Sequence, residues 1–456
     1  MKMDIQTPCV KENEVVEIQD NITKLIAKGV KIPNPSSVEV GKEVDVDRIS
    51  GKGVTLHSGV RIYGAKTLIC SGARLGYELP ATVVNCQIGP ETELRGGFFK
   101  DSTFLGKTEM ASGAHVRECC LLEEGSRGGH TAGLKQTILF PFVTLGSLIN
   151  FCDCLMAGGT GRKDHSEAGS SYIHFNYTPN QDKATASLIG DVPRGVMINQ
   201  PPIFLGGQGG LVGPLRIGYG TVIAAGTVYR EDCPEGGRLL TAPLSDRENL
   251  SLKGETSSSC PPLKRGFSDA GEFETGFYRD VKGRVYNNIC YLANLLALRQ
   301  WYIHVRQLFF QVDEFGPELY DGAMERLKLA VKERLKRFHD LSGKMEKSIK
   351  IGERRLSGTD WKTLYMQKRE LLENWQELEE CFAGGYEEEV EQGKRDPFID
   401  IIREELEKGS SDYIKTIQGL DPETSSGGTA WLQAIVDQVT SNALDVIPSY
   451  KRNLEP

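Results

Sequence analysis

The stretch Phe204–Thr227, FLGGQGGLVGPLRIGYGTVIAAGT, decides the fold. Within it, Leu205, Leu211, Ile217 and Ile223 follow one another in unbroken steps of six residues. This spacing fits neither the helical period of about 3.6 residues nor the alternation of about 2 residues in a flat sheet. It fits a triangular coil in which each side is a short strand, each corner is a turn, and one aliphatic residue per side points inward.

The same six-residue step recurs far upstream of this stretch. It is seen in the sets Val38/Val44, Val40/Val46, Val54/Val60, Leu56/Ile62/Leu68, Ile88/Leu94 and Leu139/Leu145/Phe151. Glycine often follows the inward residue, where a corner needs unusual backbone angles. Three hexapeptides make one coil of about 18 residues, so about 200 residues predict ten or eleven coils. We therefore predict an all-β left-handed parallel β-helix over residues 30–243.

The flanking segments have different patterns. Residues 1–29 are expected to form a polar tail with a short helix over Asn21–Lys28, and residues 244–276 form a polar linker. Beyond it, apolar residues recur at helical spacing, which predicts an α-helical bundle domain over residues 277–456. Its expected helices cover 281–308, about 317–349, 361–382, 398–406 and 431–439, and their apolar stripes are interpreted as core.

Composition narrows the class of protein. The 456 residues are 39% hydrophobic and 25% charged, with a net charge of −8, which argues against nucleic acid or an acidic membrane as the main partner. We expect neither a signal peptide nor a membrane span, and we place the protein in the cytoplasm. The eleven cysteines lack metal-site or disulfide spacing, so reduced thiols and no metal are expected.

Two polar segments interrupt the repeat and form the candidate site: Gly125–His130 and His174–Thr185. The first is a glycine-rich turn that presents His130, whose imidazole suits proton transfer near neutral pH. The alternative is a histidine that only caps a corner. His165 and His174 are further candidates, whereas His57 and His115 are expected in surface turns.

Two glycine-rich segments leave phosphate binding open. His165 follows Arg162 and Lys163, a cation pair that could hold a phosphate or could equally be a solvated loop tip. The segment 206–210 reads Gly-Gly-Gln-Gly-Gly, but no helix follows it, so it is better interpreted as corner glycine than as a phosphate loop.

An ordered set of motifs resembles a known family. The motifs are Leu25–Pro35, Gly113–Val116, Gly125–His130, Asn176-Tyr177 with Thr185, Ile189–Asp191, Leu211–Pro214 and Ile223–Thr227. Together they resemble the acetyltransferase half of bacterial N-acetylglucosamine-1-phosphate uridyltransferase/glucosamine-1-phosphate acetyltransferase, a hexapeptide-repeat β-helix enzyme. The resemblance covers about half of the chain, and the uridyltransferase half is expected to be absent.

The resemblance implies transfer of an acetyl group from acetyl-CoA to the amine of a sugar or sugar phosphate. By this reading His130 is the general base, and Asn176, Tyr177, Lys183, Gly207 and Ala225 contact acetyl-CoA. It also implies a homotrimer that binds CoA between subunits. Arg127, Arg162, Lys163 and His165 are our candidates for binding the sugar substrate.

The chain also departs from the family pattern. His130 and Asn176 are 46 residues apart, and the insert between them includes Gly158–His165. Gly133 stands where the family has an acceptor-binding tyrosine, and Glu118 lies near the position of a basic phosphate ligand. The arginine expected near the end of the β-helix is missing from Leu240–Pro243. A catalytically silent scaffold or sugar-nucleotide-binding protein, with a protein partner on the helical domain, is therefore the alternative function; nucleotidyltransferase activity is not supported.

Overall fold

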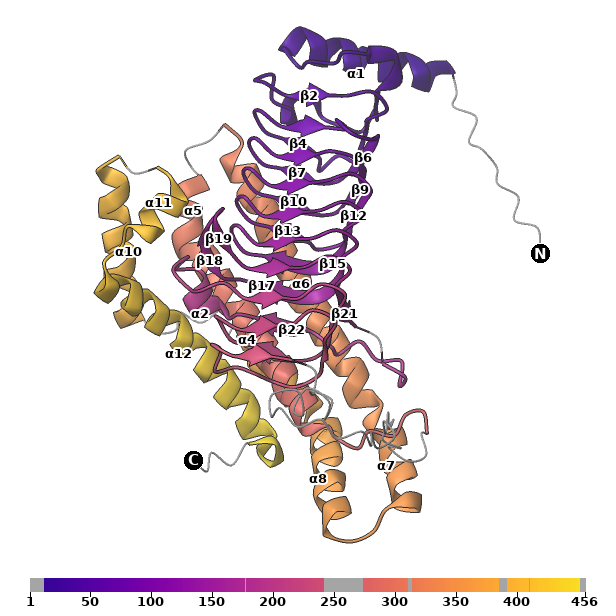
Figure 1. The fold of residues 1–456 in the computed structure, drawn as a ribbon, viewed down its shortest axis with the longest axis vertical. Helices are drawn as coiled ribbons and strands as arrows, with labels where there is room; N and C mark the ends of the chain where they lie inside the picture. The colour runs from indigo at the N-terminus through magenta and orange to yellow at the C-terminus, as the bar shows by residue number, and fades with distance from the viewer. Residues whose placement is uncertain are drawn as a thin grey trace, which may run out of the picture.

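The computed structural model describes residues 12–176, 178–241, 274–310, 314–384, 392–409 and 411–451. The chain first forms a parallel β-helix and then a group of helices that lie along it (Figure 1). This arrangement confirms the predicted left-handed β-helix followed by a helical region. The predicted linker 244–276 falls almost entirely outside the described residues, and the exact domain limits stay a prediction.

The β-helix has three sides, which the chain visits in the fixed order 1, 2, 3. On side 1 lie β1 (Glu39–Val40), β3 (Arg61–Tyr63), β6 (Ala81–Val84), β9 (Gly97–Lys100), β12 (Ala114–Arg117), β21 (Ile173–Phe175), β24 (Gly210–Val212) and β27 (Val228–Tyr229). On side 2 lie β4 (Leu68–Ile69), β7 (Gln87–Ile88), β10 (Thr103–Phe104), β13 (Leu121–Leu122), β22 (Ser187–Ile189) and β25 (Arg216–Ile217). The longer strands β15 (Gly133–Leu139) and β17 (Asn150–Met156) bend from side 1 into side 2.

Side 3 is a separate sheet with one strand from each coil. Its strands are β2 (Thr55–Leu56), β5 (Arg74–Leu75), β8 (Glu93–Leu94), β11 (Glu109–Met110), β14 (Arg127–Gly128), β16 (Thr144–Leu145), β20 (Glu167–Ala168), β23 (Phe204–Leu205), β26 (Val222–Ile223) and β28 (Leu239–Leu240). Every neighbouring pair in this sheet is parallel, as each coil lies directly on the one before it.

The register explains the six-residue period. Leu205 lies on side 3, Leu211 on side 1 and Ile217 on side 2, and Ile223 returns to side 3 in register with Leu205. All four side chains are buried. Three steps of six residues therefore complete one coil, and each aliphatic residue stacks on its counterpart in the next coil.

Helices lie before, within and after the β-helix. α1 (Glu12–Lys28) covers the first coil (Figure 1) and extends further toward the N-terminus than the predicted Asn21–Lys28. Short helices occur at η1 (Pro35–Ser37), η2 (Val46–Arg48) and α2 (Val192–Gly195). The C-terminal group comprises α4 (Lys282–Trp301), the π-helical η3 (Tyr302–Arg306), α5 (Gln307–Phe310), α6 (Gly316–Gly343), α7 (Met345–Arg355), α8 (Thr359–Glu373), α9 (Trp375–Gly384), α10 (Gln392–Glu407), α11 (Tyr413–Gln418), α12 (Pro422–Val446) and η4 (Pro448–Tyr450).

Two of the predicted helices are each divided in two, and one helix was not predicted. The expected helix 317–349 is split at Lys344 into α6 and α7, and the expected helix 361–382 is split at Asn374 into α8 and α9. α11 was not predicted, although Asp412 caps it by accepting a hydrogen bond from Lys415 N. Apolar spacing continues across each split, so periodicity alone does not show where a helix ends.

The helical region packs against side 2 of the β-helix. α6 contacts β7, β10 and β13, and α4 contacts β22. α4 is buried on nearly all its faces, because α6 and α12 cover the faces that do not contact the β-helix. Its buried residues therefore lie all round the helix and include Asn287, Asn288 and Asn294, so it does not carry a single apolar stripe. No helix in the described part of the chain is long and apolar enough to cross a bilayer.

Buried polar contacts hold the helical region against the β-helix. Arg334 of α6 forms an ion pair with Asp153 at 2.7 Å, and both side chains are at most 5% exposed. Arg306 pairs with Glu124, and Arg326 donates to the backbone oxygen of Asp101. Such contacts require a fixed geometry, because a buried charge without its partner is costly. The helices and the β-helix thus share one continuous buried core.

Candidate functional site

The three corners of the β-helix separate the predicted site residues. We call the turn from side 3 to side 1 corner A, the turn from side 1 to side 2 corner B, and the turn from side 2 to side 3 corner C. His130, Gly207 and Ala225 lie at corner A, whereas Asn176 and Lys183 follow side 1 at corner B. The insert with Arg162, Lys163 and His165 leaves the β-helix at corner C.

His130 is exposed at corner A, directly after β14. Its Nδ1 lies 2.8 Å from Ser147 Oγ in the next coil, and its backbone oxygen accepts a hydrogen bond from Leu148 N. Nε2 can accept a proton only in the neutral form of the ring that carries its hydrogen on Nδ1. In that form Nδ1 donates a hydrogen bond to Ser147 Oγ. The side chain is therefore oriented by the next coil and remains open to solvent, as a base acting on an external substrate needs.

The glycines before His130 have structural reasons of their own. Gly125 has φ +65°, a backbone conformation that favours glycine. Gly128 occupies the inward position of β14, where the side chain of Met110 fills the space, and Gly129 lies against the backbone of Gly146. Gly125 turns the chain at corner C, before β14, so the expected glycine-rich turn is in fact two corners separated by a strand. Gly128 and Gly129 permit close packing of neighbouring coils.

Corner A forms a continuous column through five coils. Ser147 N donates to Ser170 Oγ at 3.2 Å, and a side chain at Gly207 would meet Ser170 O at 2.8 Å. Ala225 and Gly226 follow in the next coil and are exposed. The column that begins at His130 therefore combines small residues such as Ser170, Gly207 and Ala225 with the larger Leu148, which is 53% exposed.

Asn176 and Lys183 belong to a different surface. Asn176 Nδ2 donates to Asp153 Oδ2 at 3.3 Å, the same carboxylate that Arg334 binds. The loop after Asn176 is held by the helical region, since Asp182 accepts from Tyr278 and Arg284. Lys183 is exposed beside this loop. Tyr177 lies outside the described residues. Side 1 thus separates His130 from Asn176 within one chain.

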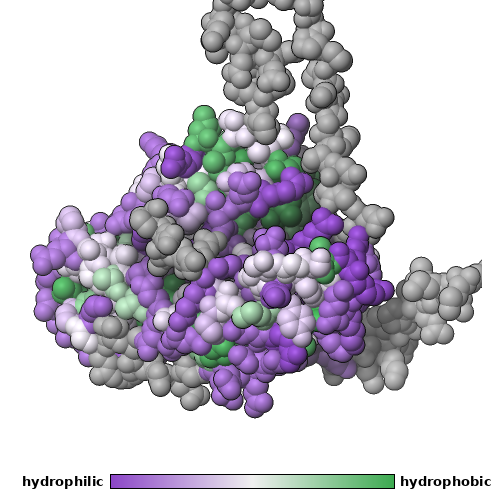
Figure 2. Space-filling model, turned by 90° about the horizontal axis from the view of Figure 1, so that it is seen from below, coloured by the Kyte–Doolittle hydropathy of each residue, from purple (hydrophilic) through white to green (hydrophobic). Residues whose placement is uncertain are grey.

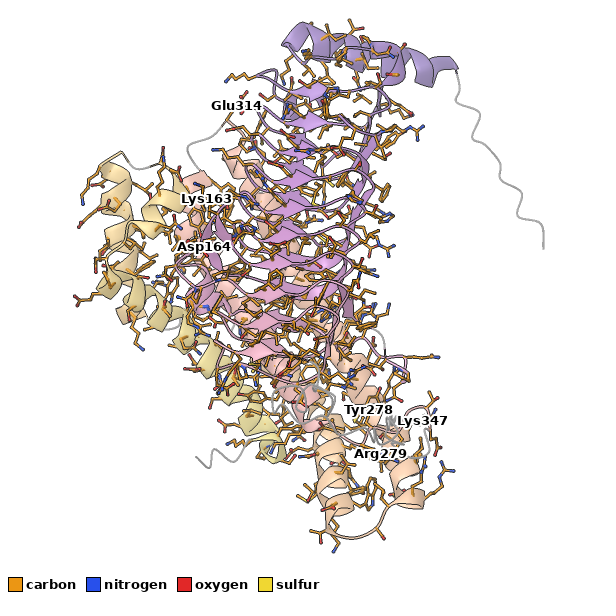
Figure 3. The ribbon with its side chains drawn as sticks, in the orientation of Figure 1. Lys163, Asp164, Tyr278, Arg279, Glu314 and Lys347 are labelled. Carbon is orange, nitrogen blue, oxygen red and sulfur yellow. The ribbon has the colours of Figure 1, made fainter. Side chains whose placement is uncertain are left out.

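The insert at corner C is a hairpin of β18 (Gly159–Gly161) and β19 (Asp164–His165). Arg162 is not a solvated loop tip: its guanidinium donates to Gly125 O, Phe142 O and Thr144 Oγ1 at 2.7–2.9 Å. Lys163 and its neighbour Asp164 are exposed on the side of the β-helix that faces the helices (Figure 3). Burial and the nearby Arg162 charge lower the pKa of His165, so it is neutral near pH 7.

Arg127 is part of an ordered row of charges on side 3. The outward residues Arg74, Glu93, Glu109 and Arg127 are in register, and Arg127 pairs with Glu109 at 2.6 Å. Arg127 precedes His130 by three residues, so it lies closer to corner A than the other predicted sugar-binding residues do. Its interaction with Glu109 gives it a structural partner as well.

Side 1 carries a row of cations that sequence reasoning missed. Lys100, Arg117 and Lys135 are in register on β9, β12 and β15, about 4.8 Å apart by the spacing of strands. Lys135 pairs with Glu118 at 2.5 Å, whereas Arg117 is exposed and has no described ion-pair partner. The signal in the sequence was a basic residue at the same register position of consecutive side-1 strands, which becomes visible only when the coil length is known.

The other histidines do not form a catalytic group. His174 is buried, its Nε2 lies 2.8 Å from Ser187 Oγ, and burial lowers its pKa to about 4. His115 stacks on Phe98 with ring centres 5.2 Å apart, and His57 contacts Tyr77 at 5.4 Å. None of the nine cysteines that the structure describes forms a disulfide. Burial raises the pKa of Cys86 to about 12, so this thiol is protonated at neutral pH.

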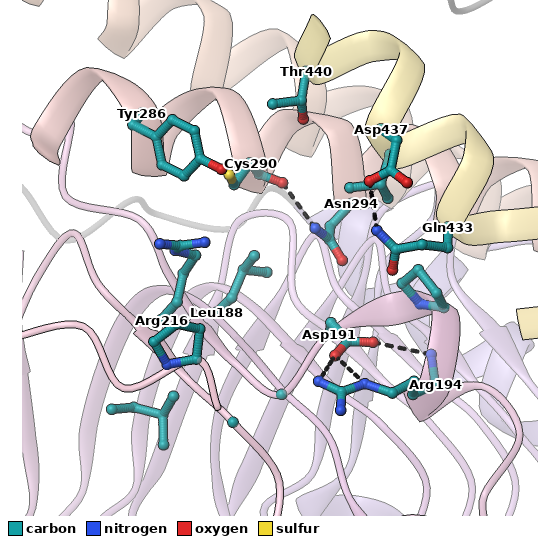
Figure 4. A pocket seen from close by; sticks show the side chains of 16 residues that line it. Leu188, Asp191, Arg194, Arg216, Tyr286, Cys290, Asn294, Gln433, Asp437 and Thr440 are labelled. Atoms are coloured by element: carbon teal, nitrogen blue, oxygen red, sulfur yellow. Dashed lines mark hydrogen bonds and ion pairs between the residues drawn. The ribbon is translucent and has the colours of Figure 1, made fainter. Parts of the chain in front are cut away.

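A cavity of about 250 Å³ lies between the last coils, α4 and α12 (Figure 4). Asp191, from the Ile189–Asp191 motif, lines it and forms an ion pair with Arg194 at 2.5 Å while capping α2. Asn294 and Asp437 enter it from α4 and α12. None of the predicted site residues lines this cavity. It lies on the helix-covered side, away from corner A.

These features define a hexapeptide-repeat parallel β-helix with an exposed, oriented histidine at one corner. No known family model matches the sequence. The chain is similar to the curated "Bifunctional protein GlmU" of Thermotoga petrophila, with 26% identity over 215 residues, 47% of this chain and 42% of that protein. It is also similar to the proteins of that name from Pelobacter propionicus, with 25% identity over 231 residues, 50% of this chain and 45% of the relative, and from Kineococcus radiotolerans, with 24% identity over 225 residues, 49% and 41%. The chain thus spans less than half the length of these relatives.

Proposed function

We propose that this protein is an acyl-CoA-dependent acetyltransferase that acts on the amine of a sugar phosphate. The observation that carries the proposal is the exposed His130 at corner A, whose Nδ1 contacts Ser147 Oγ. The row of cations at the other end of side 1 supports it. The resemblance to the acetyltransferase half of the bacterial bifunctional enzyme supports the same reaction class.

The acceptor would lie across side 1. A phosphate would bind Arg117 and Lys135, since cations hold phosphate oxygens through charge-assisted hydrogen bonds. Gly133, which has no side chain, lies in register beside His115 between this cation row and corner A. A sugar bound over Gly133 would place its amine toward His130.

His130 would then remove a proton from the amine as its nitrogen attacks the thioester carbonyl carbon. The new C–N bond forms, the C–S bond breaks, and the departing thiolate is protonated to give free CoA. The small residues of the corner A column, including Gly207 and Ala225, would leave room for the acetyl-CoA chain. Acetyl-CoA supplies the activated acyl group, and no metal takes part in this scheme.

A homotrimer would complete the site. Asn176 and Lys183 are separated from His130 by the width of side 1, so they would reach acetyl-CoA from a neighbouring copy whose corner B faces corner A. The last coils carry exposed apolar residues on both sides of corner A. They are Phe204, Val222 and Leu239 on side 3 and Ile173, Phe175 and Val228 on side 1. Apolar surface also interrupts the largely hydrophilic face at this end of the molecule (Figure 2). Exposed apolar surface of this kind is typical of subunit contacts.

The test combines binding and turnover. We expect calorimetry to detect acetyl-CoA binding to the wild-type protein, and mass spectrometry to detect acetylation of glucosamine 1-phosphate. His130→Ala should lower kcat by about 10²–10⁴ and leave the acetyl-CoA Kd unchanged. Val222→Glu should reduce the oligomer to monomers in sedimentation analysis. Absence of acetyl-CoA binding by the wild-type protein would reject the acetyltransferase proposal.

The second candidate is a catalytically silent scaffold or sugar-nucleotide-binding protein. Two observations favour it: Asn176 is bound to the buried Asp153, and Arg162 is engaged by three protein acceptors. In this case the cations on side 1 would bind a sugar nucleotide without reaction. Binding of a sugar nucleotide that is lost in Arg117→Ala, with no acetyl-CoA binding, would select this function.

A further inference from the structure

The helical region contains a groove that has no role in the proposed function. Its volume is about 480 Å³, and it lies between α6 and α9. Val331 and Phe382 form its floor and are only 5% and 1% exposed, and Leu335 is partly buried beside them. The rim on α6 consists of Lys328, Lys332, Lys336 and His339.

The three lysines form an unbalanced row of charge. They are exposed at steps of four residues on one face of α6, and none of them forms an ion pair with a described residue. Like charges at this spacing disfavour a helix, so the row has a cost that a bound anionic partner would offset. Three acidic residues of α6 have partners of their own: Glu325 binds Lys66, and Glu333 and Asp340 both bind Arg337. In a chain with a net charge of −8, this row is an exception.

The opposite rim differs in charge and is fixed in place. Glu379 of α9 accepts a hydrogen bond from Trp375 Nε1 at 3.2 Å, and the ring of His339 stacks on Trp375 with centres 5.0 Å apart. The groove therefore has a basic wall, an apolar floor and one acidic group on the far wall. This asymmetry gives a bound segment a defined orientation.

We propose that this groove binds an acidic amphipathic helix of a partner protein. A helix lying along α6 has the same rise per residue, so acidic side chains at steps of four residues would meet the three lysines over about 12 Å. An adjacent apolar stripe would enter the floor, as in other helix-in-groove complexes. A bilayer fits less well, because the apolar groups here are recessed and cannot project into lipid. Nucleic acid offers no apolar ridge for the floor.

The experiment uses a fluorescent synthetic peptide of helical sequence with Glu at steps of four residues and a neighbouring Leu stripe. Fluorescence anisotropy with the full chain at low salt should show binding. Lys328→Glu/Lys332→Glu/Lys336→Glu should weaken it at least tenfold. Lys31→Glu/Lys347→Glu/Lys362→Glu, a matched set of exposed lysines outside the groove, should leave it unchanged. Circular dichroism should show that both variants remain folded.

Further arms separate the apolar from the charged contribution. Replacing the peptide's Glu residues by Gln, or Leu335 by Gln in the protein, should each weaken binding at least threefold. Equal binding by wild type and the groove variant would overturn the proposal. So would tighter, lysine-dependent binding of a 20-base-pair DNA duplex or of phosphatidylserine vesicles. Tighter peptide binding after Glu387, Glu388 and Glu389 are changed to Gln would also overturn it. That result would mean that the chain's own acidic stretch, and not a partner protein, competes for the groove.

Discussion

Sides 1 and 2 of the β-helix are built from the same repeat and differ in what their outward residues meet. Inward residues such as Leu211 on side 1 and Ile217 on side 2 are both buried. The outward residues of side 2 are covered by α4 and α6, and Asp153 at corner B forms a buried ion pair with α6. None of the described helices covers the strands of side 1 that carry Lys100, Arg117 and Lys135. The repeat determines the core, and the helices determine which side remains available for ligands.

The largest effect is expected at the covered surface. Asp153→Ala removes the partner of the buried Arg334 and should lower the free energy of unfolding by about 3–5 kcal/mol. Chemical denaturation measures this change. The double variant Asp153→Leu/Arg334→Met should recover most of the loss, because it leaves no unpaired charge. A loss below about 1 kcal/mol for Asp153→Ala would show that this contact does not hold the helices on the β-helix.

Substitutions at inward positions should lower the stability of the protein equally on side 1 and side 2. Leu211→Ala on side 1 and Ile217→Ala on side 2 should each cost about 2–5 kcal/mol, because each leaves a cavity in the same stack. Phe204→Ala, at an outward position that is 41% exposed, is the control and should cost much less. Thermal unfolding of the three variants provides the comparison. A large difference between the two inward variants would mean that the helices also stabilise the core beneath side 2.

A smaller effect depends on pH. Glu123 of side 2 is buried and accepts a hydrogen bond from Tyr302, and burial raises the pKa of its carboxyl to about 7. The folded state therefore binds a proton that the unfolded state releases above about pH 4.5. Its stabilising contribution is complete below pH 4.5 and is lost as pH rises through 7. Glu123→Gln should flatten the fall in stability over this window.

The control for that experiment is the difference in free energy of unfolding between wild type and Glu123→Gln, measured at each pH. Subtracting the two curves removes the contributions of other titrating groups, including His174, whose lowered pKa of about 4 acts in the opposite direction. A difference that stays constant from pH 4.5 to 8 would contradict the assignment of the proton to Glu123.

The smallest effect on stability is expected on the open side. Arg117→Ala removes an exposed side chain and should change the free energy of unfolding by less than about 0.5 kcal/mol. The same change should raise the KM for the sugar phosphate about tenfold or more with little effect on the acetyl-CoA Kd, since a charge-assisted contact is lost. Lys107→Ala, on another exposed turn, is the matched control. An unchanged KM would remove the phosphate role from this row.

The sequence predicted only part of the candidate site. The order of motifs and the exposure of His130 followed from local sequence, whereas the expected glycine-rich turn Gly125–His130 is divided by β14. The positions of Asn176 and Arg162 did not, because their partners Asp153 and Gly125 are brought close only by stacking of coils. The row Lys100, Arg117 and Lys135 was missed for the same reason: β-helix neighbours are one coil apart, and coil length varies with bends such as those at Gln136 and Asp153.

By itself, the sequence determined the β-helix, because a six-residue apolar period permits only one way to bury every inward residue. It also determined the presence of helices after the β-helix, although not their limits. The tertiary structure alone decided that these helices cover side 2, that corner B is fastened by buried charges, and that corner A and side 1 remain open. The physical reason is that inward packing is a local, repeated condition, whereas the pairing of Arg334 with Asp153 joins residues 181 positions apart.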